Sequence, residues 1–143
     1  MNIKHSDVNW AHMIDFLKRQ VGKPYVFGVE NDPKEPNWDA YKFWDCSELI
    51  EVAFSKINIF VQDGSYNQAK MCKRISEAPL IGDLGFKWHP ENEVIHHVGV
   101  YIGDGNVIEA KGKKWGVVMT AIKVYEDSPD WAYWGRLKVI QDA

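Results

Sequence analysis

Apolar residues recur along the first half of the chain with the period of an α-helix. Between residues 10 and 21 they lie three and four positions apart, which predicts an amphipathic helix. The same period predicts a second helix over residues 46–57. Asp45 is a good N-cap residue for this helix, and Glu48 stands where a capping box places its acceptor. Cys46 is therefore expected to be the first helical residue.

The second half of the chain contains segments that are typical of β-strands, and an Asp104-Gly105 turn favours a tight hairpin between two of them. Residues 66–75 have a weak helical pattern and could form a short helix. The expected strands cover residues 80–86, 94–102, 107–110, 117–124 and 131–140. Helices that precede an antiparallel sheet indicate an α+β fold. A length of 143 residues fits a single domain over residues 1–143.

A polar segment with prolines lies between the first helix and Cys46. Residues 29–39 contain four acidic side chains and are too short to link two domains, so they are expected to form an acidic surface loop. We expect this insertion to overhang a site near Cys46. Residues 25–28, which precede it, are expected to be extended.

Composition and charge exclude several classes of partner. A formal net charge of −3 provides no basic surface for nucleic acid or for an anionic membrane. The N-terminus lacks the apolar stretch of a signal peptide, and no run approaches the roughly 18 apolar residues of a transmembrane helix. We therefore expect synthesis in the cytoplasm without a signal peptide, no integral membrane association, and a monomer.

The histidines and cysteines do not have the spacing of metal ligands. They include no Cys-x-x-Cys or His-x-x-x-His pair, so no metal is expected. The glycines at 103 and 105 belong to a hairpin and not to a dinucleotide fingerprint, so no cofactor is expected either. Cys46 and Cys72 could form one disulfide or remain independent thiols, and the polar neighbours of Cys46 favour a free thiol.

Cys46 has the sequence context of a nucleophile. A thiol in the first turn of a helix faces unpaired backbone N–H groups and the positive end of the helix dipole, which favour the thiolate. The candidate base is His97, whose strand face also carries Gly99. Small residues on this face leave room for a helix N-terminus or a substrate backbone. His96 falls on the opposite, aliphatic face and is expected to have a structural or edge role.

Four short segments have a combined pattern: PYVFG at residues 24–28, WDCSELI at 44–50, GDL at 82–84 and HVGVYIG at 97–103. This pattern resembles the NlpC/p60 family of cell-wall cysteine peptidases, over nearly the whole chain. Asp-Cys-Ser alone is a weak signal, but it is strong together with the histidine motif about fifty residues later. The resemblance implies a papain-like fold, in which the helix that carries Cys46 packs against the sheet that carries His97.

The resemblance also implies the roles of the catalytic residues. Cys46 would attack an amide carbonyl and His97 would protonate the leaving amine. The family places a third polar residue, most often His, about twelve residues after the histidine, and Glu109 stands there in this chain. Strand pairing disagrees, because a two-residue loop at Asp104-Gly105 would pair Val100 with Glu109 and turn the carboxylate away from His97. Unless a bulge corrects the register, Glu109 is a surface carboxylate.

Three further residues match substrate-binding positions of the family. Tyr25 matches a tyrosine beside the oxyanion site, although it could equally be a core residue. Asp45 and Ser47 match positions that hold the free amine and backbone of the stem peptide, although Asp45 could be an N-cap alone. The sequence departs from the family in its longer segment before Cys46 and in Glu48, which replaces the commoner Gly. These departures concern substrate specificity.

The resemblance implies hydrolysis of peptidoglycan stem peptides without a cofactor, at the bond between γ-D-glutamate and a diamino acid. An N-acetylmuramoyl-L-alanine amidase, or another amide hydrolase with the same Cys/His site, is an alternative, as is a non-catalytic binding domain of the same fold. A compact chain without a wall-binding module suits a phage or prophage lysis enzyme, a virion enzyme or an injected effector. Each would act on the cell wall after release, virion delivery or injection.

Overall fold

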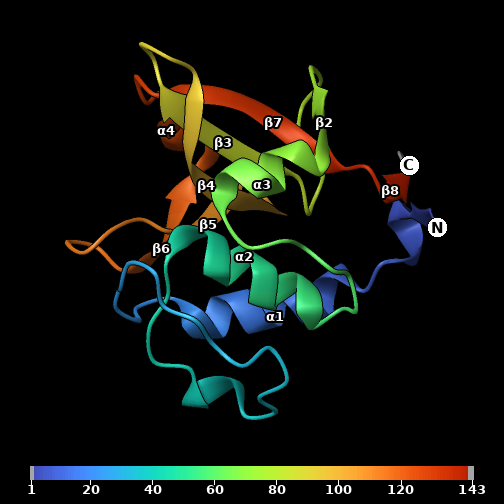
Figure 1. Cartoon of the computed structure of the whole chain (residues 1–143). Coiled ribbons are helices and arrows are strands. Elements are labelled where there is room, and N and C mark those ends of the chain that lie inside the picture. The colour runs from blue at the N-terminus through green and yellow to red at the C-terminus, as the bar shows by residue number, and fades with distance from the viewer. Residues whose placement is uncertain (1, 142–143) are drawn as a thin grey trace.

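The computed structural model describes residues 2–141, in which helices precede a six-stranded antiparallel sheet (Figure 1). Two helices, α1 (Trp10–Gln20) and α2 (Cys46–Ser55), pack against each other. The strand order is β2-β7-β3-β4-β5-β6, with β2 at Cys72–Ile75, β3 at Leu84–His89, β4 at Val94–Gly103, β5 at Asn106–Ala110, β6 at Val117–Ala121 and β7 at Trp131–Leu137. These elements confirm the α+β prediction.

Several predicted boundaries are wrong. Residues 72–75 do not continue a helix, because α3 (Ser65–Lys70) ends before them and β2 pairs with β7 at the sheet edge. The strand predicted over residues 117–124 ends at Ala121, and the chain continues into α4 (Ile122–Glu126). In both places tertiary packing overrides the local pattern, since β2 and α4 place apolar side chains in one buried cluster.

The remaining short elements are two 3₁₀ helices and a small parallel sheet. The 3₁₀ helices are η1 (His5–Asp7) and η2 (Trp38–Ala40). The parallel pair consists of β1 (Ile3–Lys4) and β8 (Ile140–Gln141), which brings the two ends of the described chain together. No helix within residues 2–141 is long and apolar enough to cross a lipid bilayer.

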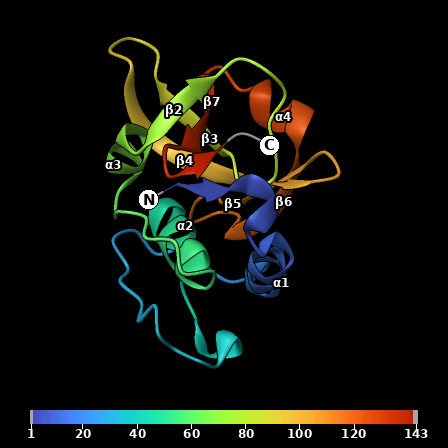
Figure 2. The ribbon, with the colours of Figure 1, turned by 90° about the vertical axis from the view of Figure 1, so that its right-hand side faces the viewer.

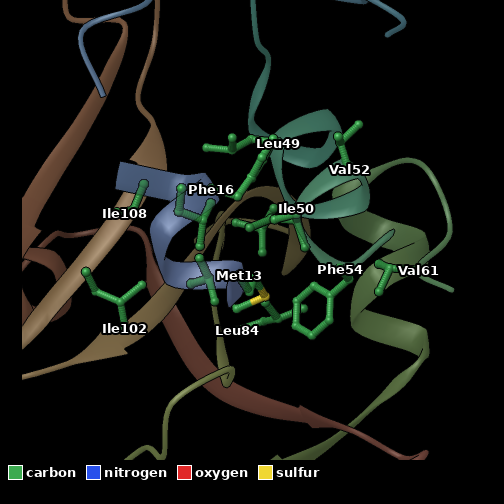
Figure 3. Packing of buried hydrophobic residues seen from close by; sticks show 14 of the residues in the cluster. Met13, Phe16, Leu49, Ile50, Val52, Phe54, Val61, Leu84, Ile102 and Ile108 are labelled. Atoms are coloured by element: carbon green, nitrogen blue, oxygen red, sulfur yellow. The ribbon is translucent and has the colours of Figure 1, made fainter. Parts of the chain in front are cut away.

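The main hydrophobic core fills the space between the two long helices and the sheet. Figure 3 shows its side chains interleaved, with Phe16 from α1, Ile50 from α2 and Ile108 from β5, all of them fully buried. Truncation of such a buried leucine or isoleucine to alanine costs about 2–5 kcal/mol. This packing holds α2, and with it Cys46, in a fixed position relative to the strands.

A smaller cluster covers the opposite face of the sheet, where Tyr125 of α4 is 1% exposed. A Cβ atom added at Gly99 would lie 2.9 Å from the Tyr125 hydroxyl, and one added at Gly85 would lie 2.7 Å from its ring. The glycines on the His97 face therefore make room for Tyr125. They do not admit the helix N-terminus or substrate backbone that the sequence suggested.

A buried ion pair joins the start of β3 to the end of β7. Arg136 donates from Nε and Nη2 to the two carboxylate oxygens of Asp83, at 2.8 and 2.7 Å, and these side chains are 2% and 1% exposed. The Leu80 N–H donates to the same carboxylate at 2.8 Å. Asp83, part of the GDL segment of the sequence pattern, is therefore a structural residue.

The acidic insertion packs against the helices and does not overhang the site. Lys56 Nζ, at the end of α2, donates to the carbonyl oxygens of Pro33 and Glu35 at 2.9 and 3.0 Å and to the Tyr41 hydroxyl at 2.8 Å. Figures 1 and 2 both show the loop, in light blue and teal, on the side of α1 and α2 that faces away from the sheet. The Lys56 ammonium holds the loop in this position, because its positive charge and its hydrogen-bond donors face the oxygens of an acidic segment.

Candidate active site

The position of Cys46 is set by the cap of α2. Asp45 has extended backbone angles, and its Oδ1 accepts a hydrogen bond from the Glu48 N–H at 2.8 Å. Its Oδ2 accepts from the Gly28 N–H at 3.0 Å. Helix α2 therefore begins at Cys46, as predicted, and the thiol lies at the positive end of the helix dipole. The capping box is only half formed, because the Glu48 carboxylate instead accepts from the Asn31 N–H.

His97 connects Cys46 to Glu109. Its Nε2 lies 2.8 Å from Glu109 Oε1, which leaves Nδ1 for Cys46, a residue that lines the same cleft and helps to raise the pKa of His97. Burial of His97 opposes its positive charge, but the hydrogen bonds and negative charges of Cys46 and Glu109 outweigh burial and raise the pKa of His97 to about 9. At neutral pH the imidazole is therefore protonated beside the Cys46 sulfur.

A β-bulge brings Glu109 to the same face as His97. Val100 pairs with Ile108 and Tyr101 with Val107, and the register shifts between Tyr101 and Gly103. The simple two-residue hairpin predicted that Val100 would pair with Glu109, and this prediction is wrong by one residue. Because one residue of slip exchanges the two faces of a strand, the bulge turns Glu109 toward His97.

The carboxylate of Glu109 is fully hydrogen-bonded although its side chain is only 2% exposed. Oε2 accepts a hydrogen bond from Thr120 Oγ1 at 2.6 Å, while Oε1 is bound to His97. Burial alone would raise the pKa of Glu109, but the bonds to His97 and Thr120 and the charge of Lys87 lower it below its usual range. Glu109 is thus held as an anion that orients the imidazole. Sequence reasoning missed Thr120, because its relation to Glu109 depends on the pairing of β5 with β6.

Tyr25 lies beside Cys46 because the two segments form a short ladder. The Trp44 N–H donates to the Pro24 carbonyl at 3.1 Å, and the Val26 N–H donates to the Trp44 carbonyl at 3.0 Å. Burial, together with the negative charges of Cys46 and Asp45, raises the pKa of Tyr25 to about 12. Its hydroxyl therefore keeps its proton at neutral pH and can donate a hydrogen bond.

These residues meet in an open cleft of about 340 Å³. Four of the six predicted site residues line it, namely Tyr25, Cys46, His97 and Glu109, whereas Asp45 and Ser47 do not. Ser47 is buried and donates to Asp45 Oδ1 at 3.4 Å. The rest of the lining was not predicted and consists of Lys87, His96, Lys111, Trp115, Ser128 and Asp130.

His96 lines the cleft and does not share the aliphatic face, contrary to the prediction. Lys87 pairs with His97 but Trp88 pairs with Ile95, so a second bulge leaves His96 without a partner on β3. His96 Nε2 lies 3.0 Å from Asp130 Oδ2. Burial lowers the pKa of His96, and the nearby Asp130 only partly offsets this effect.

The second cysteine has a different environment. Cys72 is buried in β2, and burial raises the pKa of its thiol to about 12. Both cysteines are free thiols in the structure. Cys46 therefore lines the cleft, whereas Cys72 packs in the core.

One group of carboxylates could hold a cation. Glu48, Glu51 and Asp63 each place an oxygen within 4.8 Å of the others. Burial raises the pKa of Glu48 to about 7, so this carboxyl group is only partly charged at neutral pH. The search of the sequence for His and Cys ligands could not detect this group, in which the fold brings Asp63 to Glu48 and Glu51, two neighbours on α2.

A thiol at a helix N-terminus, an imidazole in the same cleft and a carboxylate bound to that imidazole are the arrangement of a papain-like cysteine hydrolase site. Comparison with known proteins identifies the family. The model of the NlpC/P60 family matches residues 22–136, and the chain belongs to this family.

Individual relatives are moderately similar. "Probable endopeptidase YafL" of Escherichia coli (strain K12) is 34% identical over 98 residues, which cover 66% of this chain and 36% of that protein. "Bifunctional muramidase/DL-endopeptidase CwlT" of Bacillus subtilis (strain 168) is 32% identical over 91 residues, which cover 62% of this chain and 25% of that protein. The chain thus spans about a third or less of the length of these relatives.

A solved structure shows the same fold. The peptidoglycan hydrolase RipB of Mycobacterium tuberculosis superimposes with a TM-score of 0.69, at 22% identity, over 92% of this chain and 65% of that one. This likeness confirms the papain-like NlpC/P60 fold of the chain.

Proposed function

We propose that the chain is a cysteine peptidase that hydrolyses an amide bond in the stem peptides of peptidoglycan. The observation that carries the proposal is that Cys46, His97 and Glu109 line one cleft, with His97 Nε2 bound to Glu109 Oε1 at 2.8 Å. Family membership supports it, as does the similarity in fold to RipB, a peptidoglycan hydrolase.

The chemistry follows from the arrangement of these groups. The Cys46 sulfur attacks the amide carbonyl carbon, and the C–N bond breaks as His97 gives its proton to the leaving amine. Water then gives a proton to His97 and attacks the thioester, which releases a carboxylate and frees the thiolate. Glu109 stabilises the charged imidazole throughout. The Tyr25 hydroxyl and the Cys46 N–H are suited to stabilise the oxyanion.

Within this class we propose the bond between γ-D-glutamate and the diamino acid as the substrate. CwlT, which is similar to this chain, is named in part a DL-endopeptidase. Asp45 and Ser47 occupy the family positions for the amine and backbone of the stem peptide. Asp45 already accepts two backbone hydrogen bonds, so its part in substrate binding would be long-range attraction of the amine. We further propose action on the wall from outside, after release, virion delivery or injection.

The test is digestion of purified sacculi followed by mass analysis of the released fragments and their new amino groups. We expect the wild type to expose the amino group of the diamino acid and Cys46→Ala, the matched control, to release nothing. A new amino group on L-alanine would identify an N-acetylmuramoyl-L-alanine amidase. Binding of sacculi without any release would identify a non-catalytic binding domain, and release by Cys46→Ala would remove the cysteine mechanism.

A further inference from the structure

The loop between β5 and β6 forms a fixed rim of the cleft. It covers residues 111–116 and is closed by hydrogen bonds from the Lys111 N–H to the Gly116 carbonyl at 2.9 Å and from the Gly116 N–H to the Gly112 carbonyl at 2.8 Å. A Cβ atom at Gly116 would lie 2.4 Å from the Lys23 carbonyl oxygen, so the loop packs directly on the segment that leads to Tyr25. Figure 1 shows this loop in orange, extending from the sheet at β6.

Two ammonium groups share one exposed indole on this rim. Lys111 Nζ lies 4.6 Å and Lys114 Nζ 5.4 Å from the centre of the Trp115 ring. Lys111 and Trp115 line the cleft, and Trp115 is 52% exposed. The cation–π contact with the indole positions the Lys111 ammonium, and because Lys111 is exposed, this ammonium is accessible to an anion in the cleft.

Lys111 differs from the other cation of the cleft wall. Lys87 Nζ lies 4.3 Å from the centre of the buried Tyr125 ring, and its positive charge contributes to the lowered pKa values of Glu109 and Asp130. Lys111 forms no ion pair with any of residues 2–141. Within these residues, its ammonium makes a cation–π contact with Trp115. It is therefore the lysine of the cleft wall that remains available to a substrate.

Lys111 lies in the same cleft as His97. It directly follows the last residue of β5, the strand that pairs with β4, and both side chains line the cleft. In the proposed mechanism His97 protonates the leaving amine, so the group that leaves lies against this wall. The proposed function assigns the amine and backbone on the acyl side of the bond to the start of α2.

We propose that Lys111, seated on Trp115, binds a carboxylate of the leaving diamino acid. This inference rests on the proposed function and specifies its substrate: a diamino acid with a side-chain carboxylate, such as diaminopimelate, in preference to lysine. The α-carboxylate of γ-linked D-glutamate is the other anion near the scissile bond. It has the same chemistry but belongs to the acyl side.

The experiment uses four synthetic tetrapeptides, L-Ala-γ-D-Glu-X-D-Ala and L-Ala-γ-D-isoGln-X-D-Ala, in which X is meso-diaminopimelate or L-lysine. We expect the wild type to cleave the diaminopimelate peptides with kcat/KM about tenfold higher, as for one partly exposed charge pair at a binding site. Lys111→Met keeps the aliphatic stem, and we expect it to reduce that preference to about twofold or less by slowing only the diaminopimelate peptides. Added salt should weaken the wild-type preference in the same direction.

The matched control is Lys113→Met, which removes an exposed lysine of the same loop that neither lines the cleft nor contacts Trp115. It should retain the wild-type preference. Equal rates on both diamino acids, or an equal loss on both in Lys111→Met, would overturn the inference. The wild type could instead prefer the D-glutamate peptides over the D-isoglutamine peptides, and Lys111→Met could remove this preference. That result would assign Lys111 to the acyl side of the bond and would also overturn the inference. If none of the four peptides is cleaved, the proposed γ-D-glutamyl specificity fails instead.

Discussion

Two buried acid–base pairs in this molecule share their geometry but differ in what they can do. Asp83 with Arg136 and Glu109 with His97 each place a carboxylate that is at most 2% exposed within 2.8 Å of its basic partner. Each carboxylate also accepts one further hydrogen bond, from the Leu80 N–H in the first pair and from the Thr120 hydroxyl in the second. By burial and distance alone the two pairs would be assigned the same role.

The difference lies in the basic partner. Arginine does not lose its proton in proteins, and the Arg136 side chain is 2% exposed, so the first pair is a permanent cross-link between β3 and β7. His97 can exchange a proton, is 13% exposed to the cleft, and has its second nitrogen against Cys46. A buried carboxylate supports chemistry only when its partner can titrate and has a free atom in contact with substrate.

The largest effect on stability should follow from breaking the permanent pair. Arg136→Met leaves the Asp83 carboxylate buried without its partner, which should cost about 3–5 kcal/mol in the free energy of unfolding, measured by urea titration. The cleft residues are untouched, so the folded fraction should hydrolyse sacculi at the wild-type rate per molecule.

A second substitution keeps this prediction testable if Arg136→Met does not fold. Adding Asp83→Asn removes the unpaired charge and keeps an acceptor for the Leu80 N–H, so the double variant should recover part of the lost stability. If Arg136→Met unfolds at the wild-type midpoint, the pair is not the cross-link described above.

Glu109→Gln should lower stability less than Arg136→Met does and should lower turnover more. The amide oxygen can still accept from His97, but the charge that stabilises the imidazolium is gone, so kcat should fall by about tenfold to a thousandfold. Because Glu109 helps to raise the pKa of His97 to about 9, the alkaline limb of the pH–rate profile should move to lower pH. An unshifted limb would assign catalysis to Cys46 and His97 alone.

The same variant has a predictable effect on the pH dependence of stability. The pKa of His97 in the folded protein lies above its ordinary value of about 6.5. Its pairing with Glu109 therefore stabilises the fold fully below about pH 6.5, and this contribution is lost as the pH rises through about 9. The stability difference between the wild type and Glu109→Gln should accordingly be larger at pH 6 than at pH 9.5.

The smallest effect should come from Thr120→Val, which removes the hydroxyl that donates to Glu109 Oε2. One hydrogen bond to the orienting carboxylate is lost, so kcat should fall by about two- to tenfold, with less change in KM. Thr120→Ser keeps the hydroxyl and is the matched control. Equal rates in the valine and serine variants would show that Glu109 is held sufficiently by His97.

Much of the active site could be predicted from local sequence. The start of α2 depends on Asp45, which is adjacent to Cys46, so the cap and the nucleophile are visible in consecutive residues. His97 follows from its place on a strand and from the family pattern. These features depend on contacts between neighbours in the chain.

The rest depends on registers that local sequence does not encode. The bulge near Tyr101 decides which face carries Glu109, and the bulge near Ile95 decides that His96 faces the cleft. A one-residue slip leaves the local alternation of apolar residues intact on either side, so the pattern cannot reveal it. Lys111 and Trp115 were likewise missed, because the fold of their loop depends on contacts with the distant segment at Lys23.

The parallel pairing of β1 with β8 has a consequence for the connectivity of the chain. The Ile3 N–H donates to the Val139 carbonyl at 2.7 Å, and Ile3 pairs with Ile140, so a short linker could join these two strands. By the chain-entropy argument, closing so long a loop would restrict the unfolded state by an amount on the order of 4–5 kcal/mol. If such a closed chain were then opened between α2 and α3, His97 would precede Cys46 in sequence while every contact of the cleft was kept. The order of Cys46 and His97 along the chain thus depends on where the backbone is opened, and the contacts of the site do not depend on that order.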